Sequence, residues 1–123
     1  MYAIDKSELL EYTIEGDTSG TIFQLGMLDA FEVAYVQSLA VQPEEKFYFS
    51  IRVVSIGLKG WKNFKNRKGE NVPFITSATT LPNIGDISIM SNESLKLLSS
   101  DAMLKLANKI LEINIYTDAD KKK

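Results

Sequence analysis

The richest concentration of chemically useful side chains lies between residues 57 and 69, which read Gly-Leu-Lys-Gly-Trp-Lys-Asn-Phe-Lys-Asn-Arg-Lys-Gly. Five basic and two aromatic residues fall within ten positions there: Lys59, Trp61, Lys62, Phe64, Lys65, Arg67 and Lys68. Because basic side chains neutralise phosphates and aromatic side chains stack on bases, the pattern is compatible with nucleic-acid binding. We favour a solvated turn whose two aromatic side chains enter the core, because the chain is slightly acidic and carries no RNA-binding signature.

The glycines of this segment do not form a phosphate-binding loop. Such a loop needs two glycines five positions apart, with Lys and then Ser or Thr after the second. Gly60 and Gly69 are too far apart, and Glu70 follows the second glycine. Neighbouring acids such as Glu44 and Glu45 are more typical of a hydrated surface than of a glycosidase pair. We therefore expect no catalytic residue, no cofactor and no metal site.

The composition limits the chemistry further. The chain has 123 residues and a net charge of −2, and it contains neither cysteine nor histidine. Disulfides, thiolate chemistry, the common structural zinc sites and Ser-His-Asp or Cys-His catalysis are therefore excluded within one chain. With 45% hydrophobic and 24% charged residues, it has enough apolar material for a core of its own. We expect a non-enzymatic single α+β domain over residues 1–117 and a flexible charged tail over 118–123.

No targeting or membrane-spanning pattern is visible in the sequence. Charged residues interrupt every apolar stretch well before the roughly 20 residues that cross a bilayer. The N-terminal residues lack the apolar core of a signal peptide. We therefore expect no membrane partner and a location in the cytoplasm of a bacterium or an infected cell.

The charges are unevenly distributed along the chain. Residues 1–45 carry nine acids and one base, whereas residues 46–75 carry seven bases and one acid. Folding could bring the two segments together within one monomer. Alternatively, they could lie on different faces, so that an acidic face of one copy meets a basic face of the next in a homo-oligomer. The sequence leaves both arrangements open.

The N-terminal region predicts a β-hairpin followed by a helix. Residues 9–15 and 21–25 alternate apolar and polar side chains, and a dense turn signal separates them. Asp29 has the side chain of a helix N-cap, and Glu32 stands three residues on as a capping-box partner. We therefore place a helix over about 30–40, followed at Pro43 by a break or by the start of the next helix.

Residues 46–61 permit two interpretations. An alternating set favours a strand: Phe47, Phe49, Ile51 and Val53. A second set has the spacing of a helix: Phe47, Ile51, Val54, Leu58 and Trp61. We favour the helix because of the length of the segment, with Gly57 and Gly60 marking its end.

The C-terminal half contains a turn, a long loop and two helices. We expect a turn at 66–69, an irregular edge strand at 72–75, and a long loop at 76–92 with a short strand at 87–90. The last third predicts a helical pair, capped by Ser91 or Asn92 and by Ser99 or Ser100. The apolar face of the second helix would consist of Met103, Leu106, Ala107, Ile110 and Leu111.

The segment from Gly57 to Phe74 resembles a motif of small proteins encoded among the structural genes of tailed bacteriophages. The motif is a Gly-Leu-Lys-Gly-Trp-x-Asn-Phe string, then a polar turn ending in Gly, then Val-Pro-Phe. Here the string occupies 57–64, the turn ends at Lys68-Gly69, and Val-Pro-Phe occupies 72–74. The likeness is close over these residues and loose elsewhere, and the basic stretch 66–68 replaces an Asp-rich turn.

The resemblance implies a bacteriophage structural or assembly protein, either a capsid or tail component or an assembly chaperone, present in the infected cell or the virion. Its partners would be capsid or tail proteins, contacted through the basic and aromatic segment defined above. A nucleic-acid-binding accessory protein and a phage regulator of a host protein are the two alternatives.

Overall fold

The computed structural model describes residues 3–39 and 46–115. The protein is α+β, with an N-terminal β-hairpin and a C-terminal helix as expected. The elements follow the chain in the order β1 (Leu9–Tyr12), β2 (Ile22–Gly26), α1 (Ala30–Leu39), α2 (Lys46–Gly57), β3 (Leu58–Lys62), β4 (Thr76–Leu81), β5 (Gly85–Met90), α3 (Asn92–Leu95) and α4 (Ser100–Asn114).

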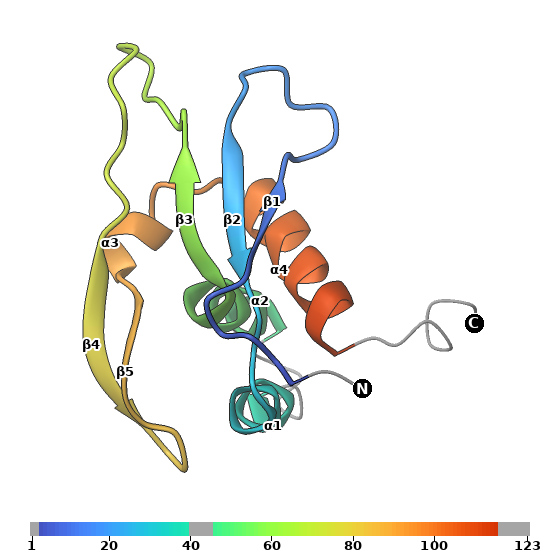
Figure 1. Ribbon diagram of the computed structural model, residues 1–123. Helices are drawn as coiled ribbons and strands as arrows, with labels where there is room; N and C mark the ends of the chain where they lie inside the picture. Colours follow the sequence, from blue (N-terminus) through green and yellow to red (C-terminus); the bar gives the residue numbers. More distant parts are fainter. Residues whose placement is uncertain (1–2, 40–45, 116–123) are drawn as a thin grey trace.

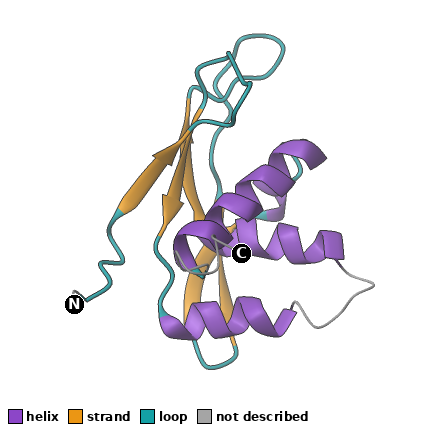
Figure 2. Cartoon of the chain, turned by 90° about the vertical axis from the view of Figure 1, so that its right-hand side faces the viewer, coloured by secondary structure: helices purple, strands orange, loops and turns teal. Residues whose placement is uncertain are grey.

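The strands form two separate antiparallel sheets. One sheet has the order β1-β2-β3, and the other is the hairpin β4–β5. Helices α2 and α4 pack against each other behind the three-stranded sheet, on one of its two faces (Figures 1 and 2). The β4–β5 hairpin lies beside this layered unit, and β5 is the strand that packs against α2 and β3.

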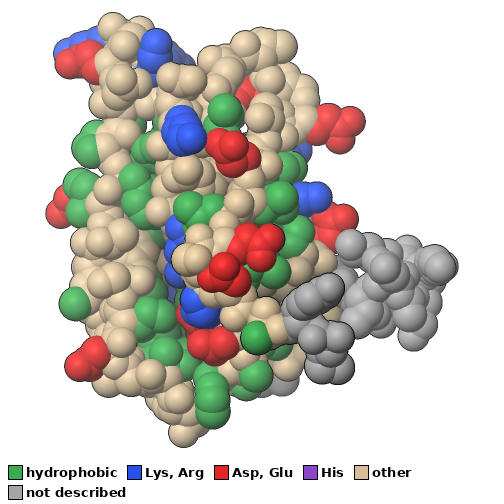
Figure 3. Space-filling model, in the orientation of Figure 1, with side chains coloured by type: hydrophobic (Ala, Val, Ile, Leu, Met, Phe, Trp, Pro, Cys, Tyr) green, Lys and Arg blue, Asp and Glu red, His purple; other side chains and the backbone are tan. Residues whose placement is uncertain are grey.

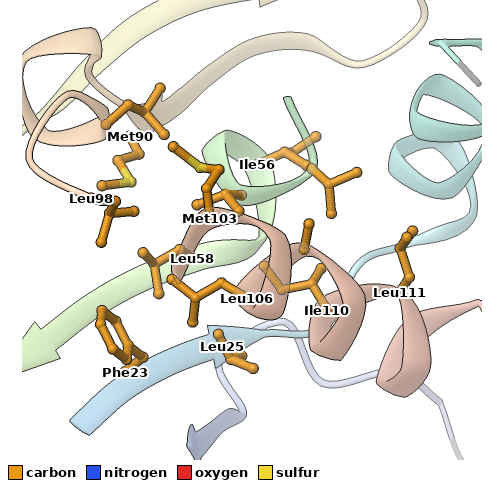
Figure 4. Packing of buried hydrophobic residues seen from close by; sticks show 14 of the residues in the cluster. Phe23, Leu25, Ile56, Leu58, Met90, Leu98, Met103, Leu106, Ile110 and Leu111 are labelled. Atoms are coloured by element: carbon orange, nitrogen blue, oxygen red, sulfur yellow. The ribbon is translucent and has the colours of Figure 1, made fainter. Parts of the chain in front are cut away.

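The core lies between the three-stranded sheet and its helices. Because side chains alternate along a strand, Phe23 and Leu25 of β2 point inward and are buried, whereas Gln24 points outward. Figure 4 shows Leu25 beside Leu106 of α4, and Phe23 and Ile110 belong to the same buried cluster. The apolar face predicted for the last helix is confirmed, since all five of its residues are buried.

Polar side chains start the helices as the sequence predicted. Asp29 accepts a hydrogen bond from the Glu32 backbone N–H at 2.9 Å, and the Glu32 carboxylate accepts one from the Asp29 N–H at 2.9 Å. This reciprocal pair is a capping box. Ser91 caps α3, and Ser99 caps α4 by accepting from the Ala102 N–H at 3.1 Å. The break expected at Pro43 and the tail expected at 118–123 lie outside the described residues.

The prediction of a helix over 46–61 is correct only in part. The helix ends at Gly57, and Leu58 begins strand β3, so both hydrophobic periods in the segment are real and follow one another. Gly57 is the last residue of the helix, and there is no space for a side chain at this position. A Cβ there would lie 2.5 Å from the Cγ2 atom of the buried Ile110 side chain. The close approach of α4 therefore requires glycine where the helix becomes the strand.

The prediction of a long loop over 76–92 is wrong. These residues form β4 and β5, whose register pairs Thr76 with Met90 and Leu81 with Gly85. A tight turn joins them: the Ile84 N–H donates to the Leu81 carbonyl at 3.2 Å, and Asn83 has a positive φ of 63°. The hydroxyl residues that suggested a loop include threonines, which are β-branched and fit a strand. The strand expected at 87–90 lies within β5.

The segment preceding β4 is tied to the short helix α3. The Ser94 hydroxyl, which is fully buried, accepts a hydrogen bond from the Ile75 N–H at 2.9 Å. It also lies 3.5 Å from the Pro73 carbonyl, to which it donates. The Ser91 N–H donates to the Ile75 carbonyl at 2.8 Å. Residues 72–75 lie outside the named strands, and the predicted strand there begins only at Thr76.

Candidate functional site

The motif between Gly57 and Phe74 folds into one aromatic cluster at the end of β3. The Trp61 ring meets Phe64 at 4.7 Å and Phe74 at 5.0 Å between centroids, both edge-to-face. Phe23 of β2 completes the cluster at 6.4 Å from Trp61. The indole N–H donates to the Val72 carbonyl at 2.7 Å, so the polar edge of the ring is also satisfied.

This geometry accounts for the spacing of the motif. Trp61 on β3 reaches across the loop to both Val72 and Phe74, so the Val-Pro-Phe segment is held by the tryptophan eleven residues before it. Such edge-to-face pairs contribute about 0.5–1.5 kcal/mol each beyond the area they bury. The two aromatic residues at the centre of the motif are half-buried and packed against each other, so both rings are engaged in contacts within the protein.

Between β3 and Val72 the chain forms a small protruding loop. The Asn66 side-chain oxygen accepts from the Lys68 N–H at 2.9 Å and from the Glu70 N–H at 3.1 Å. Gly69 has a φ of 81°, as expected for the glycine of the predicted turn. Lys65 forms an isolated bridge with Asn71 at the base of the loop. The loop is therefore ordered by its own polar side chains.

The seven residues that the sequence grouped together are separated into three places. Trp61 and Phe64 belong to the aromatic cluster. Three of the seven are exposed side chains on the loop, Lys65, Arg67 and Lys68, and the segment after β3 that carries them lies at one end of the molecule (Figure 1). The other two bases, Lys59 and Lys62, lie on β3.

Lys59 and Lys62 project from the outer face of the three-stranded sheet, away from the helices. Lys62 contacts the Glu11 carboxylate of β1 at 3.3 Å across β2, which is an exposed pair. Lys59 is the extra residue where the β2–β3 register shifts, and its aliphatic chain lies over Gly26. Burial lowers the pKa of the Lys59 ammonium, and the positive charge of Lys6 lowers it further.

The acidic segment 1–45 and the basic segment 46–75 are joined by few ion pairs in the part of the monomer that the structure describes. Among the described residues, the pair of Lys62 and Glu11 is the one ion pair that joins the acidic first segment to the basic second one. Lys6 instead pairs within its own segment, with the buried carboxylate of Glu32 and with Asp29 at 3.6 Å. The cations at the tip of the 63–72 loop therefore remain available to another molecule.

An apolar groove, which the sequence did not reveal, lies on the helical side of the molecule. It has a volume of about 420 Å³ and runs between α2, α3 and the start of α4. Its lining is mainly apolar and comprises Phe47, Tyr48, Ile51, Arg52, Asn92, Leu95, Lys96, Leu98, Ser100 and Met103. Two aromatic side chains on α2 remain accessible at its wall, Phe47 at 43% and Tyr48 at 63% exposed. We refer to these residues as the α2 groove.

The signal for the α2 groove was present in the sequence but hidden by the ambiguity of 46–61. Once the segment is a helix, Phe47 and Ile51 stand one turn apart on one side, with Tyr48 beside them. Val53 and Val54 are fully buried on the core side of the same helix. A helix with apolar residues on two sides has more apolar surface than its own core uses.

A second hollow, of about 410 Å³, lies at the end of the sheet between the β1–β2 connection and the start of α4. Asp17 and Asp101 are among its lining residues. The Asp17 carboxylate is already occupied by the Ser19 N–H and hydroxyl, at 3.1 and 2.8 Å. The carboxylate of Asp17 is therefore engaged within its own turn, and the hollow suggests no particular chemistry.

Within residues 3–39 and 46–115, no group of three or more acidic side chains is placed to hold a metal ion. All buried side-chain nitrogen and oxygen atoms in that part have hydrogen-bond partners. None of the described helices is both long and apolar enough to cross a membrane. Comparison with known proteins gave no match among family models, curated proteins or solved structures.

Proposed function

We propose that the protein is a non-enzymatic assembly protein of a tailed bacteriophage, acting through protein–protein contacts in the infected cell or the virion. The α2 groove is the observation that carries this proposal. Its two accessible aromatic residues are of the kind that anchors protein interfaces, because they bury a large area at a low cost in side-chain entropy.

The groove favours a partner segment with apolar side chains and acidic neighbours. Its lining includes three buried apolar residues, Leu95, Leu98 and Met103, which would receive apolar side chains from an amphipathic helix or an extended peptide. Arg52 and Lys96 lie on its lining and would pair with acids on the partner. This chemistry suits a capsid or tail component better than a polyanion, which has no apolar side chains to bury.

The resemblance to phage structural proteins supports the phage setting rather than the contact itself. The motif that carries it holds the aromatic cluster together, as the bond between Trp61 and Val72 illustrates. Relatives that share the motif would therefore share the fold of this region. The binding surface could still differ between them, as the basic turn 66–68 already does.

The test compares two aromatic substitutions with equal exposure. Tyr48→Ala removes a groove residue, whereas Phe31→Ala removes a side chain that is also 63% exposed but lies on α1, outside the groove. Each full-length variant is produced together with the phage capsid and tail proteins, and the bound protein is quantified after affinity purification. We expect Tyr48→Ala to weaken binding about tenfold or more and Phe31→Ala to leave it unchanged.

Two results would count against the proposal. Equal binding by Tyr48→Ala and the unaltered protein would show that the α2 groove is not the contact. Binding to a protein of the uninfected host, with none to phage components, would favour the regulator instead.

A nucleic-acid-binding accessory protein is the second candidate, because three cations cluster at the tip of the 63–72 loop. The protein would then contact phosphates through Lys65, Arg67 and Lys68, without base stacking. Binding to DNA or RNA would weaken steeply with salt and would disappear in the triple alanine variant of these residues. This candidate would be excluded if the unaltered protein and the triple alanine variant bound DNA or RNA equally well and independently of the salt concentration.

A further inference from the structure

Strand β4 forms an open edge of its sheet. It is hydrogen-bonded to β5 on one side only, and β5 in turn packs toward α2 and β3. In Figure 1, β4 is the outermost strand at the left of the molecule, with no described element beyond it. None of its six residues is buried. An edge of this kind offers unpaired backbone groups to another strand.

The residues that face this open edge follow from the hydrogen bonds of Ile75, just before the strand. The Ile75 N–H and carbonyl are both engaged on the β5 side, by Ser94 and Ser91. At the other end of β4 the Leu81 carbonyl also points inward, since it accepts from the Ile84 N–H of the turn. Because neighbouring residues of a strand direct their backbone groups to opposite edges, those of Thr76, Ala78 and Thr80 point outward.

The sequence of this edge is chemically symmetrical. Residues 75–81 read Ile-Thr-Ser-Ala-Thr-Thr-Leu, which is an apolar residue, two hydroxyl residues, alanine, two hydroxyl residues and an apolar residue. The strand also lies within the longest charge-free stretch of the chain, the fifteen residues from Asn71 to Gly85. The surface at the left of Figure 3, where Figure 1 draws β4, is accordingly mostly tan.

We infer that β4 pairs antiparallel with β4 of a second copy of this chain, about a twofold axis at Ala78. The axis is perpendicular to the sheet, which keeps equivalent side chains on the same face. The pairs are then Ala78 with Ala78, Ser77 with Thr79, Thr76 with Thr80, and Ile75 with Leu81. The result is a continuous four-stranded sheet with the order β5-β4-β4-β5.

Two features select a second copy as the occupant. The three outward-facing residues pair only with one another in this register, so each exchanges both of its backbone hydrogen bonds. A twofold contact also places the residue at its axis opposite its own copy, and like charges placed opposite each other destabilise a sheet. A charge-free strand with matching ends meets that condition, whereas a strand of another protein would not require the symmetry. This contact uses none of the residues of the α2 groove and holds whether or not the groove binds a phage component.

The first test measures the mass of the full-length protein in solution by analytical ultracentrifugation. We expect a monomer–dimer equilibrium with a dissociation constant of about 1 mM or lower, so that dimers are seen as the protein concentration is raised to that value. Ala78→Lys places two ammonium groups opposite each other at the axis and should be monomeric. Ser88→Lys is the matched control, because Ser88 faces Ala78 across the hairpin and is also exposed, but lies on β5. It should still dimerise.

The second test does not depend on the affinity of the dimer. The chain contains no cysteine, so a single substitution gives an unambiguous crosslink. Opposite residues of a hydrogen-bonded antiparallel pair have Cα atoms about 5.5 Å apart. That separation lies within the range of roughly 4.4–6.8 Å that a disulfide spans. Ala78→Cys should therefore form a disulfide-linked dimer under mild oxidation. Ser88→Cys should not, because the two β5 strands would lie about three strand spacings, roughly 14 Å, apart.

The inference is overturned if the unaltered protein is monomeric throughout that range, if Ala78→Lys still dimerises, or if the Ala78→Cys and Ser88→Cys variants crosslink equally. Dimers that survive Ala78→Lys would be formed by another surface. Circular dichroism of each variant distinguishes loss of pairing from loss of folding, and an unfolded Ala78→Lys leaves the cysteine pair to decide.

Discussion

The two sheets of this protein differ in the charge of their edge strands, β1 and β4. In the three-stranded sheet the edge strand β1 carries Glu11, paired with Lys62, and is preceded by Glu8 and Lys6. In the hairpin the edge strand β4 carries no charge at all. Charged side chains on an edge discourage pairing with other strands. The charged edge of β1 is therefore protected against pairing with another strand, whereas the uncharged edge of β4 is compatible with a partner strand.

The sheets also differ in how much of their surface the core covers. Phe23, Leu25 and Leu58 of the three-stranded sheet are almost completely buried under α2 and α4. In the hairpin, Met90 at the end of β5 is the one buried residue. We therefore expect global stability to depend on the first sheet and its helices. Substitutions in the hairpin should affect stability less and association more.

The strongest test of this contrast truncates one apolar residue in each region. Leu106→Ala empties a fully buried position between α4 and the three-stranded sheet and should lower the free energy of unfolding by about 2–5 kcal/mol. Ile87→Ala truncates a half-buried residue of β5 and should cost less than half as much. Urea unfolding of both variants measures the two values. Equal losses would mean that the hairpin belongs to the same cooperative core.

The next largest effect concerns the junction of α2 and β3. Gly57→Ala would place a Cβ 2.5 Å from the Ile110 side chain, which is buried and branched at that point, and should destabilise the protein by about 1–3 kcal/mol. Gly60→Ala is the matched control on β3. Its Cβ would meet only the Gln24 side chain, whose Oε1 atom, 2.5 Å away, is at the free end of a flexible side chain. A larger loss for Gly60→Ala would contradict the close approach of α4.

A third prediction addresses the link between the hairpin and the core. Ser94→Ala removes the buried hydroxyl that accepts from the Ile75 N–H, leaving that donor without its partner at a cost of about 1–3 kcal/mol. Exposed Ser88→Ala serves as the control and should change little. Hydrogen exchange should show faster opening of the Ile75 amide in the first variant only. Unchanged protection of that amide would show that the hydroxyl does not hold the start of β4.

The smallest effect is expected at Lys59, where the charge rather than the packing is unfavourable. Its pKa in the folded protein lies below the ordinary value of 10.5, mainly because of burial and also because of Lys6. Between these two pKa values the unfolded chain binds more protons, so the free energy of unfolding rises as the pH rises through that window. Below the folded pKa the penalty is constant.

Lys59→Met keeps the aliphatic chain over Gly26 and removes the charge. The variant should therefore be more stable than the unaltered protein at pH 7, and the advantage should shrink as the pH approaches 10.5. Lys62→Met, at an exposed position on the same strand, should not stabilise the protein at pH 7, because it removes the ion pair with Glu11. Urea unfolding at several pH values provides the measurement, and a constant difference for Lys59→Met would refute the stated cause.

Several features of the local structure followed from short-range rules applied to the sequence. The capping box of Asp29 and Glu32, the Ser99 cap, the Gly69 turn and the buried face of α4 all involve residues within a few positions of one another. Such contacts are fixed by backbone geometry, so the residue types predict them. The absence of cysteine and histidine likewise limited the available chemistry before any fold was known.

Only the tertiary structure decided where the candidate residues lie. Adjacent residues of β3 point to opposite faces, and a register shift displaces Lys59, so a compact sequence cluster became an aromatic core, an outer face and a loop tip. The change from helix to strand at Gly57 depends on the distant Ile110, and the open edge of β4 depends on which strand pairs with β5. The physical reason is that these features arise from contacts between residues far apart in the chain, which no local pattern encodes.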